Sequence, residues 1–387
     1  MSDKPLASRR DFIMGAATGV FGGALAGMGL YSYTPMAYDR LPKPKRAGTE
    51  FGAVRSVKLT NISETSWFNN AHLVGDLKDA GGLLVDQYTI GWAPFGNGKG
   101  AAKSSYDEGI APIKAMLPGD LEAAWDIQKK RSLHPDNPGG FSTLIEVEDL
   151  DGSKHKYLLD VGWSYDWMLQ SFKREAIDQM LAAGEIEALI LSHEHFDHFW
   201  GLPVAMKYAS KIPMYIHNGF YKEGKQYIKD SGYKGDPIVI DKELTQIRPG
   251  MMAIKFDIPI ITRVYGEVSL AFNVKDKGLV LVSGCNHQGI LQMTTTAYQK
   301  LKYDNDKFYG LYGGLHISPF EDWDPKYDDL VMSLGKWGFE KLGCNHCTGH
   351  LTAKKFVEVG YPVIKGTARF RTSSPDYLGN GDTITFG

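Results

Sequence analysis

The segment His193–His198 reads His-Glu-His-Phe-Asp-His and lies one residue after a run of four apolar residues at 188–191. Side chains two positions apart on an extended chain point the same way, so His193 and His195 can bind one metal ion from one side. Asp197 and His198 can face a second ion if the chain turns into a helix at that point. Imidazole and carboxylate ligands favour zinc, with iron and manganese as alternatives.

Three later short runs, which we expect to be strands, also end in loops that carry metal-ligand residues. These runs are residues 279–283, 308–312 and 341–343, followed by Cys285 and His287, by His316 and by His346 respectively. Loops at the carboxyl ends of strands form the active sites of layered α/β proteins. We therefore expect the histidine-bearing loops to converge on one metal centre.

The signature at 193–198 resembles that of the metallo-β-lactamase superfamily, and Asp160-Val161-Gly162 matches the Asp-x-Gly that usually precedes it. The resemblance implies an α/β fold, a four-layer αββα sandwich with a dinuclear metal site at one edge of its two sheets. Three later segments are similar to those of the dihydropterin-methyl-ribofuranosylaminobenzene-phosphate synthase-like branch. They are Gly284–Ile290, Gly313–His316 and His346–Gly349.

The resemblance and the spacing together imply two divalent ions, each held by three protein ligands. His193, His195 and a third histidine would hold one ion, while Asp197, His198 and a later histidine would hold the other. We expect His287 and His346 to be the two later ligands. Cys285 and His316 are further candidates: Cys285 as a ligand or as lining of the site, and His316 on a metal or on a substrate anion.

Other residues are expected to catalyse the reaction or to support the metal ligands. Asp197 is the expected catalytic residue, because it can orient the nucleophile and pass a proton to the leaving group. Asp160 can fix the tautomer of a ligand histidine from behind. His350 is also expected to contact the ligands, as are His72, His134 and His155.

Two ions about 3.5–4 Å apart would lower the pKa of a bridging water towards about 7 and hold the attacking and leaving oxygens. The leading hypothesis is therefore a hydrolase that uses metal-bound hydroxide on a small-molecule ester, lactone, lactam or phosphoester. One alternative is an iron-dependent redox enzyme on the same scaffold. Another is a catalytically silent metal-binding protein.

The amino terminus resembles a twin-arginine export signal. Arg9 and Arg10 precede Phe12 and a mildly hydrophobic run, rich in glycine and alanine, that extends to about Leu30. This order of features predicts the twin-arginine export machinery as a partner and a periplasmic or exported location. A membrane-anchored form is expected if the signal is not cleaved.

The chain is expected to contain one large folded unit after its signal. We predict a signal region at 1–37, a linker at 38–50 and a metallo-β-lactamase-like domain at 51–387. An irregular insertion is expected within that domain at about 67–138, where two glycine-rich stretches interrupt any regular pattern.

Charge and cysteine content narrow the alternatives further. Lys and Arg total 43 against 45 Asp and Glu, with no basic patch, so nucleic acid is not an expected partner. Cys344 and Cys347 have the C-x-x-C spacing. They can either pair as a disulfide in an oxidising compartment or stay reduced beside a metal.

Overall fold

The computed structural model describes five stretches of the chain, together with Asp79 and Ala115. These stretches are residues 48–64, 139–260, 264–319, 323–372 and 374–387. The predicted signal region, most of the linker and nearly all of the predicted insertion lie outside the described residues, as do His72 and His134. In the part that is described, no helix combines the length and the apolar character needed to cross a membrane.

One sheet has seven strands in the order β15-β2-β3-β4-β5-β6-β7. The strands from β4 to β7 run parallel to one another, and the other neighbouring pairs are antiparallel. The bounds are β2 (Ser56–Ser63), β3 (Ser142–Glu148), β4 (Lys154–Leu159), β5 (Ile186–Ile190), β6 (Met214–His217), β7 (Ile238–Ile240) and β15 (Thr383–Phe386). The apolar run before His193 forms β5 of this sheet.

The second sheet has six strands in the order β14-β13-β11-β10-β9-β8. Its parallel strands are β11, β13 and β14, which are the three strands predicted to end in metal-ligand loops. The bounds are β8 (Leu244–Arg248), β9 (Met251–Ile260), β10 (Val264–Val274), β11 (Gly278–Ser283), β13 (Phe308–Gly313) and β14 (Lys341–Cys344). A separate short pair joins β1 (Thr49–Glu50) to β12 (Leu301–Lys302).

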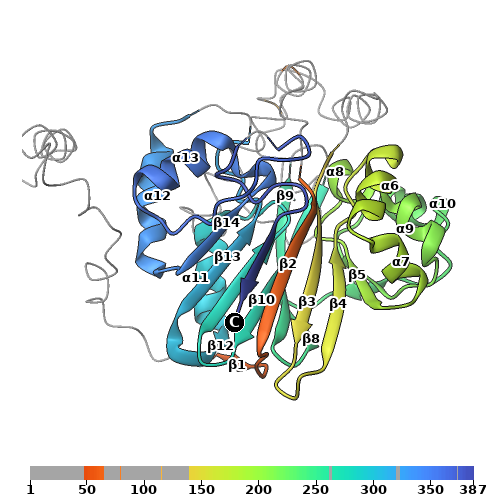
Figure 1. Ribbon diagram of the computed structural model, residues 1–387, viewed down its shortest axis with the longest axis horizontal. Coiled ribbons are helices and arrows are strands. Elements are labelled where there is room, and N and C mark those ends of the chain that lie inside the picture. Colours follow the sequence, from red (N-terminus) through yellow and green to blue (C-terminus); the bar gives the residue numbers. More distant parts are fainter. Residues whose placement is uncertain are drawn as a thin grey trace, which may run out of the picture.

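The two sheets pack face to face and each carries helices on its outer face (Figure 1). The seven-stranded sheet is covered by α6 (Tyr165–Arg174), α7 (Ile177–Ala182), α9 (Leu202–Tyr208) and α10 (Lys222–Asp230). The six-stranded sheet is covered by α11 (Ile290–Lys300), α12 (Lys326–Leu334) and α13 (His350–Glu358). The predicted four-layer αββα sandwich is confirmed.

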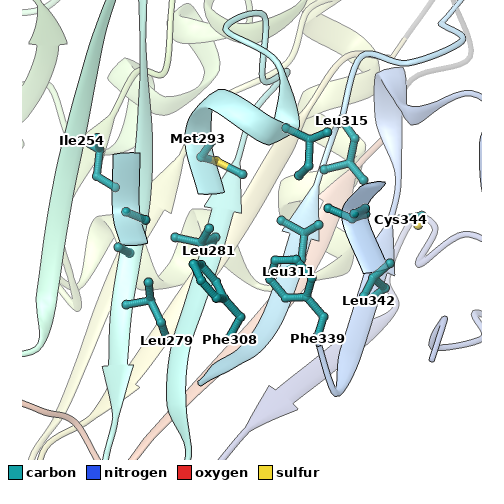
Figure 2. Packing of buried hydrophobic residues seen from close by; sticks show 14 of the residues in the cluster. Ile254, Leu279, Leu281, Met293, Phe308, Leu311, Leu315, Phe339, Leu342 and Cys344 are labelled. Atoms are coloured by element: carbon teal, nitrogen blue, oxygen red, sulfur yellow. The ribbon is translucent and has the colours of Figure 1, made fainter. Parts of the chain in front are cut away.

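Alternation along the strands explains why both faces of each sheet are buried. On β11, Val280 and Val282 face the other sheet, while Leu279 and Leu281 face the helices. Successive side chains of a strand point to opposite faces, and burial of each such side chain stabilises the fold by about 1.5–3 kcal/mol. Figure 2 shows Leu279 and Leu281 beside Phe308 and Leu311 of β13, with Met293 of α11 above them.

Glycines allow the strand ends to approach one another closely at the edge where the ligand-bearing loops begin. A Cβ atom on Gly284 would lie 2.5 Å from the Ser192 hydroxyl oxygen, across the seam between the sheets. Gly313 has φ +123°, and a Cβ there would lie 1.9 Å from the Ser283 carbonyl oxygen. Larger residues at these two positions would force the loops after β5, β11 and β13 apart.

Candidate metal centre

Three histidines from two sheets form the first group of potential ligands. His193 and His195 follow β5, and His287 follows β11. Nε2 of His193 lies 2.9 Å from Nδ1 of His195, and the His287 ring centroid lies 4.9 and 4.8 Å from those of the other two. One ligand atom of each residue lies within 4.8 Å of the others. The expected sharing of one face by His193 and His195 is thus present in the structure.

Asp197, His198 and His346 form the second group. Asp197 and His198 lie on the short helix α8 (Phe196–Phe199), the predicted turn of helix after the first two histidines. His346 begins the 3-10 helix η5 (His346–Thr348) after β14. Its Nε2 lies 3.0 Å from Nε2 of His198 and 3.4 Å from a carboxylate oxygen of Asp197.

Cys285 brings sulfur to this second group. Its Sγ lies 3.1 Å from Nε2 of His198 and 3.2 Å from Nε2 of His346. Cys347, which the sequence allowed to lie reduced beside a metal, donates its S–H to the Cys285 carbonyl oxygen at 3.3 Å and forms a donor group with Cys285 and His346. All three cysteines are free and buried, so the alternative of a Cys344–Cys347 disulfide is wrong in this structure.

Asp160 contacts a histidine of the second group from behind. It follows β4, and its carboxylate accepts hydrogen bonds from the Ser192 backbone N–H (2.7 Å) and hydroxyl (2.6 Å). The same carboxylate lies 2.7 Å from Nδ1 of His198. A proton on Nδ1 leaves Nε2 of His198 with a lone pair that faces Cys285 and His346.

Glu267 supports the loop after β11, and sequence reasoning missed it. Its buried carboxylate on β10 accepts backbone hydrogen bonds from Cys285 (3.1 Å), Asn286 (2.6 Å) and His287 (2.7 Å). Asn286 has φ +68°, a conformation that asparagine tolerates better than most residues. The sequence feature that could have identified Glu267 is a single acidic residue in an otherwise uncharged strand, which the structure shows to be fully buried.

Glu194 lies between two ligand histidines and is buried with them. Its carboxylate accepts a hydrogen bond from the backbone N–H of Tyr221, directly before α10, at 2.9 Å. A Cβ on Gly224 would lie 1.9 Å from that carboxylate, so α10 packs closely against Glu194. The His-Glu-His sequence is therefore held in place by a neighbouring helix.

Burial and mutual repulsion keep the ligand histidines neutral. Burial, followed by the charges of neighbouring imidazoles, holds the pKa of His193, His198, His287 and His346 well below the usual value. A neutral imidazole has a lone pair available for a metal ion. Because these imidazoles resist protonation, their ring nitrogens stay available as metal donors.

Burial acts in the opposite direction on the acids and thiols around the cluster. It raises the pKa of Asp160 and of Cys285 well above their usual values. Burial also raises the pKa of Glu267 to about 7, although the three backbone hydrogen bonds oppose it. A nearby cation would favour the charged forms of all three groups.

The donor set fits divalent metal ions. Ligand atoms around a tetrahedral zinc, at about 2.1 Å from it, lie about 3.4 Å apart. The separations within the second group are 3.0, 3.4 and 3.7 Å between His198, His346 and Asp197. These donors therefore already have the spacing that a shared cation needs, and histidine with aspartate and cysteine is a donor set suited to zinc or iron.

The remaining sequence candidates occupy different positions. The His316 ring lies 4.2 Å from that of His287, but His316 belongs to none of the donor groups found in the described residues. His350 stacks on Tyr377, whose hydroxyl donates to the His346 carbonyl oxygen at 3.3 Å. His350 is therefore linked to the ligand His346 through Tyr377.

The expectation for His155 is wrong. This residue lies near the start of β4, about five residues from the strand end that carries Asp160, and pairs with Glu187 at 2.5 Å and Asp149 at 3.4 Å. Five residues of strand span about 16 Å, too far for contact with the ligands. The carboxylates of Glu187 and Asp149 bind His155 at the opposite edge of the sheet.

Comparisons with known proteins support the family resemblance. The model of the metallo-beta-lactamase superfamily matches residues 136–282, which include the His193–His198 signature. The chain is 28% identical over 256 residues to 7,8-dihydropterin-6-methyl-4-(beta-D-ribofuranosyl)-aminobenzene-5'-phosphate synthase of Methanocaldococcus jannaschii. That alignment covers 57% of this chain and 84% of the relative. The resemblance predicted from the signature and the later loops is confirmed.

Two solved structures are also similar to this chain. One is a metal-dependent hydrolase of the β-lactamase superfamily, with 21% identity, a TM-score of 0.43, and coverage of 57% of this chain and 85% of that chain. The other is an N-acyl homoserine lactone hydrolase with its product at the catalytic metal centre. It has 16% identity and a TM-score of 0.27, covering 38% of this chain and 64% of that chain.

Proposed function

We propose that the buried histidine cluster of this chain, which is similar to the metallo-β-lactamase superfamily, holds two divalent metal ions and catalyses hydrolysis. The proposed substrates are small molecules with an ester, lactone, lactam or phosphoester bond. His193, His195 and His287 would hold one ion. Asp197, His198 and His346, with Cys285 beside them, would hold the other.

One observation carries this proposal: two sets of buried donors from different strand ends lie side by side. The rings of His193 and His198 have centroids 4.1 Å apart, so the two groups are direct neighbours. A single structural zinc needs four ligands, and this cluster offers more donors than that. The surplus supports two adjacent ions better than one.

Bound there, the ions would activate a water molecule as the nucleophile and neutralise negative charge that develops on the substrate. The chain's own residues supply the rest of the chemistry. Asp197 can accept a proton from the nucleophilic water and deliver it to the leaving oxygen or nitrogen as its bond to carbon or phosphorus breaks. Asp160 keeps the His198 ring in one orientation throughout.

Aromatic rings restrict access of water to the cluster. Phe141 is fully buried, with its ring 5.8 Å from that of His198 and 5.5 Å from that of His346. His195 and His316 are the most exposed histidines of the cluster, at 6% and 4%. A substrate therefore approaches most readily from the side of His195 and His316, and His316 is placed to contact it.

A bond-forming reaction is the second candidate, because the relative from Methanocaldococcus jannaschii is a synthase. The same donors could activate a different nucleophile in place of water. A product that joins two substrates, without any hydrolysis product, would favour this candidate over hydrolysis.

We also propose that the protein is exported through the twin-arginine pathway. The support is the Arg9-Arg10 pair and the mildly hydrophobic run after it. That pathway carries folded proteins, which suits a site assembled from distant loops. Replacement of both arginines by lysine should leave the full-length protein in the cytoplasm, and unchanged export would contradict the proposal.

The function is tested by metal analysis and a substrate panel on the purified protein. We expect close to two zinc ions per chain, and turnover of at least one ester, lactone, lactam or phosphoester that is lost with a chelator and restored by zinc. Bound iron with oxygen uptake would favour the redox alternative. Metal binding without any turnover would favour a silent metal-binding protein.

A further inference from the structure

A turn near the metal centre has an unusual backbone. Ala368, Phe370 and Arg371 have φ values of +52°, +50° and +74°, although none is glycine. Side chains with a Cβ rarely adopt this left-handed region, and such strain persists only where the surroundings impose it. The turn exposes the Phe370 ring and the Arg371 side chain to solvent.

Three arginines gather at this turn, and one of them has no carboxylate partner among the residues that the structure describes. Arg174 and Arg369 lie 4.6 and 5.1 Å from the centroid of the Phe370 ring. Arg174 pairs with Glu175 at 2.7 Å, and Arg369 lies 3.9 Å from Asp382.

Arg371 differs from both. Its guanidinium lies 5.4 Å from the centroid of a Trp167 ring, and it makes no ion pair or hydrogen bond with another described residue. The cation–π contact orients the guanidinium and leaves its N–H groups available. Arg371 is therefore an oriented cation that lacks an anionic partner.

Two short routes connect this turn to the metal centre. The buried Glu64 carboxylate accepts hydrogen bonds from the Thr372 side chain and from the backbone of His346. Glu64 therefore links the residue after Arg371 to a proposed metal ligand. On the other side, the Trp167 indole donates to the Ser63 hydroxyl at 2.9 Å, and that hydroxyl donates to the Gly140 carbonyl at 2.8 Å. A Cβ on Gly140 would lie 2.2 Å from the Asp197 carbonyl oxygen.

We propose that Arg371, oriented by Trp167, recognises an anionic group of the substrate at the rim of the metal centre. The group would be a phosphate or a carboxylate, because the planar guanidinium fork binds both through paired hydrogen bonds. This proposal rests on the proposed function, since it assigns a substrate class to that site. The exposed Phe370 ring provides an apolar surface beside the anion.

Calorimetric titration of the zinc-loaded protein tests the proposal without turnover. The ligands are phenylphosphonate, benzoate and the neutral analogue benzamide. The variants are Arg371→Gln, Arg371→Lys and, as a matched control, Lys365→Gln, which removes an exposed charge from the same segment. We expect Arg371→Gln to weaken binding of at least one anion about tenfold and Arg371→Lys to weaken it less. Benzamide binding should not change.

The binding results identify the anion or overturn the proposal. A loss confined to phenylphosphonate assigns a phosphate, and a loss confined to benzoate assigns a carboxylate. Unchanged anion binding in Arg371→Gln, an equal loss in Lys365→Gln, or no binding of either anion to the unaltered protein would overturn the proposal. If Arg371→Gln loses anion affinity but the protein hydrolyses none of the panel substrates, the anion site stands and the hydrolase assignment fails.

Discussion

The Asp160 carboxylate lies 2.7 Å from Nδ1 of His198, and both side chains are fully buried. The contact determines which nitrogen of His198 faces the other ligands, because the proton on Nδ1 is held by the carboxylate. Asp160 comes from the end of β4 and His198 from α8 after β5, so one hydrogen bond joins two adjacent loops. Its removal has consequences for metal binding that can be measured.

Asp160→Asn should reduce zinc affinity about 10- to 100-fold while the protein stays folded. The asparagine amide keeps the shape of the carboxylate but loses its charge, so it no longer fixes the His198 tautomer. Competition with a chromophoric chelator measures the affinity. Asp241→Asn, an exposed change beyond β7, is the control and should bind zinc normally. Normal zinc affinity in Asp160→Asn would remove Asp160 from the site.

His198→Ala should abolish hydrolysis, with a loss of at least about a thousandfold in kcat/KM, because it removes a proposed ligand of the second ion. His155→Ala is the matched control, since it removes a histidine at the opposite edge of the sheet. Circular dichroism should show that both variants are folded. Undiminished turnover in folded His198→Ala would contradict the two-ion mechanism.

Glu267→Gln should lower the free energy of unfolding by about 2–4 kcal/mol, because three backbone N–H groups lose their carboxylate acceptor. The loop that carries Cys285 and His287 would loosen, so zinc affinity should fall as well. Urea unfolding measures the first effect and chelator competition the second. In Glu243→Gln, which alters an exposed ion pair with Lys300, neither quantity should change by more than a few tenths of a kcal/mol.

Asp257 should make the stability of the protein depend on pH. Burial alone would raise the pKa of Asp257, but hydrogen bonds from His217 and Lys255 outweigh burial and lower it to about 2. A lowered folded-state pKa means that the ionised group stabilises the fold above the unfolded-state pKa of about 4. This contribution is lost as the pH falls through about 2.

The comparison of Asp257→Asn with the unaltered protein measures this contribution. Urea unfolding near pH 7 should give a difference of about 1–2 kcal/mol, discounted because Asp257 is partly exposed. The difference should shrink between about pH 4 and pH 2. A pH-independent difference for Asp257→Asn would mean that the lost stability is not electrostatic.

Much of the site could be predicted because residues that commonly bind metals follow the ends of expected strands in the sequence. His193, His195, Asp197 and His198 are local to one another, so spacing alone places them together. The segment after β11 could be assigned to the same edge, since a buried strand precedes it. The sandwich itself followed from the family resemblance rather than from periodicity.

Other features depend on contacts between residues far apart in the sequence. Glu267 supports three backbone groups about twenty residues away, and only the pairing of β10 with β11 brings it there. The contact of Cys347 with Cys285 likewise needs β13 to lie between β11 and β14. His155 was misplaced because it was expected on a less structured segment, whereas it lies within β4.

The pairing of β15 with β2 has a consequence for biosynthesis. Residues 383–386 complete a sheet whose first strand is made more than three hundred residues earlier, and His346 also emerges late from the ribosome. Until then β2 presents an open hydrogen-bonding edge, and the early histidines lack their later neighbours. Prematurely terminated chains should therefore aggregate or be degraded before they can compete for zinc with the finished protein.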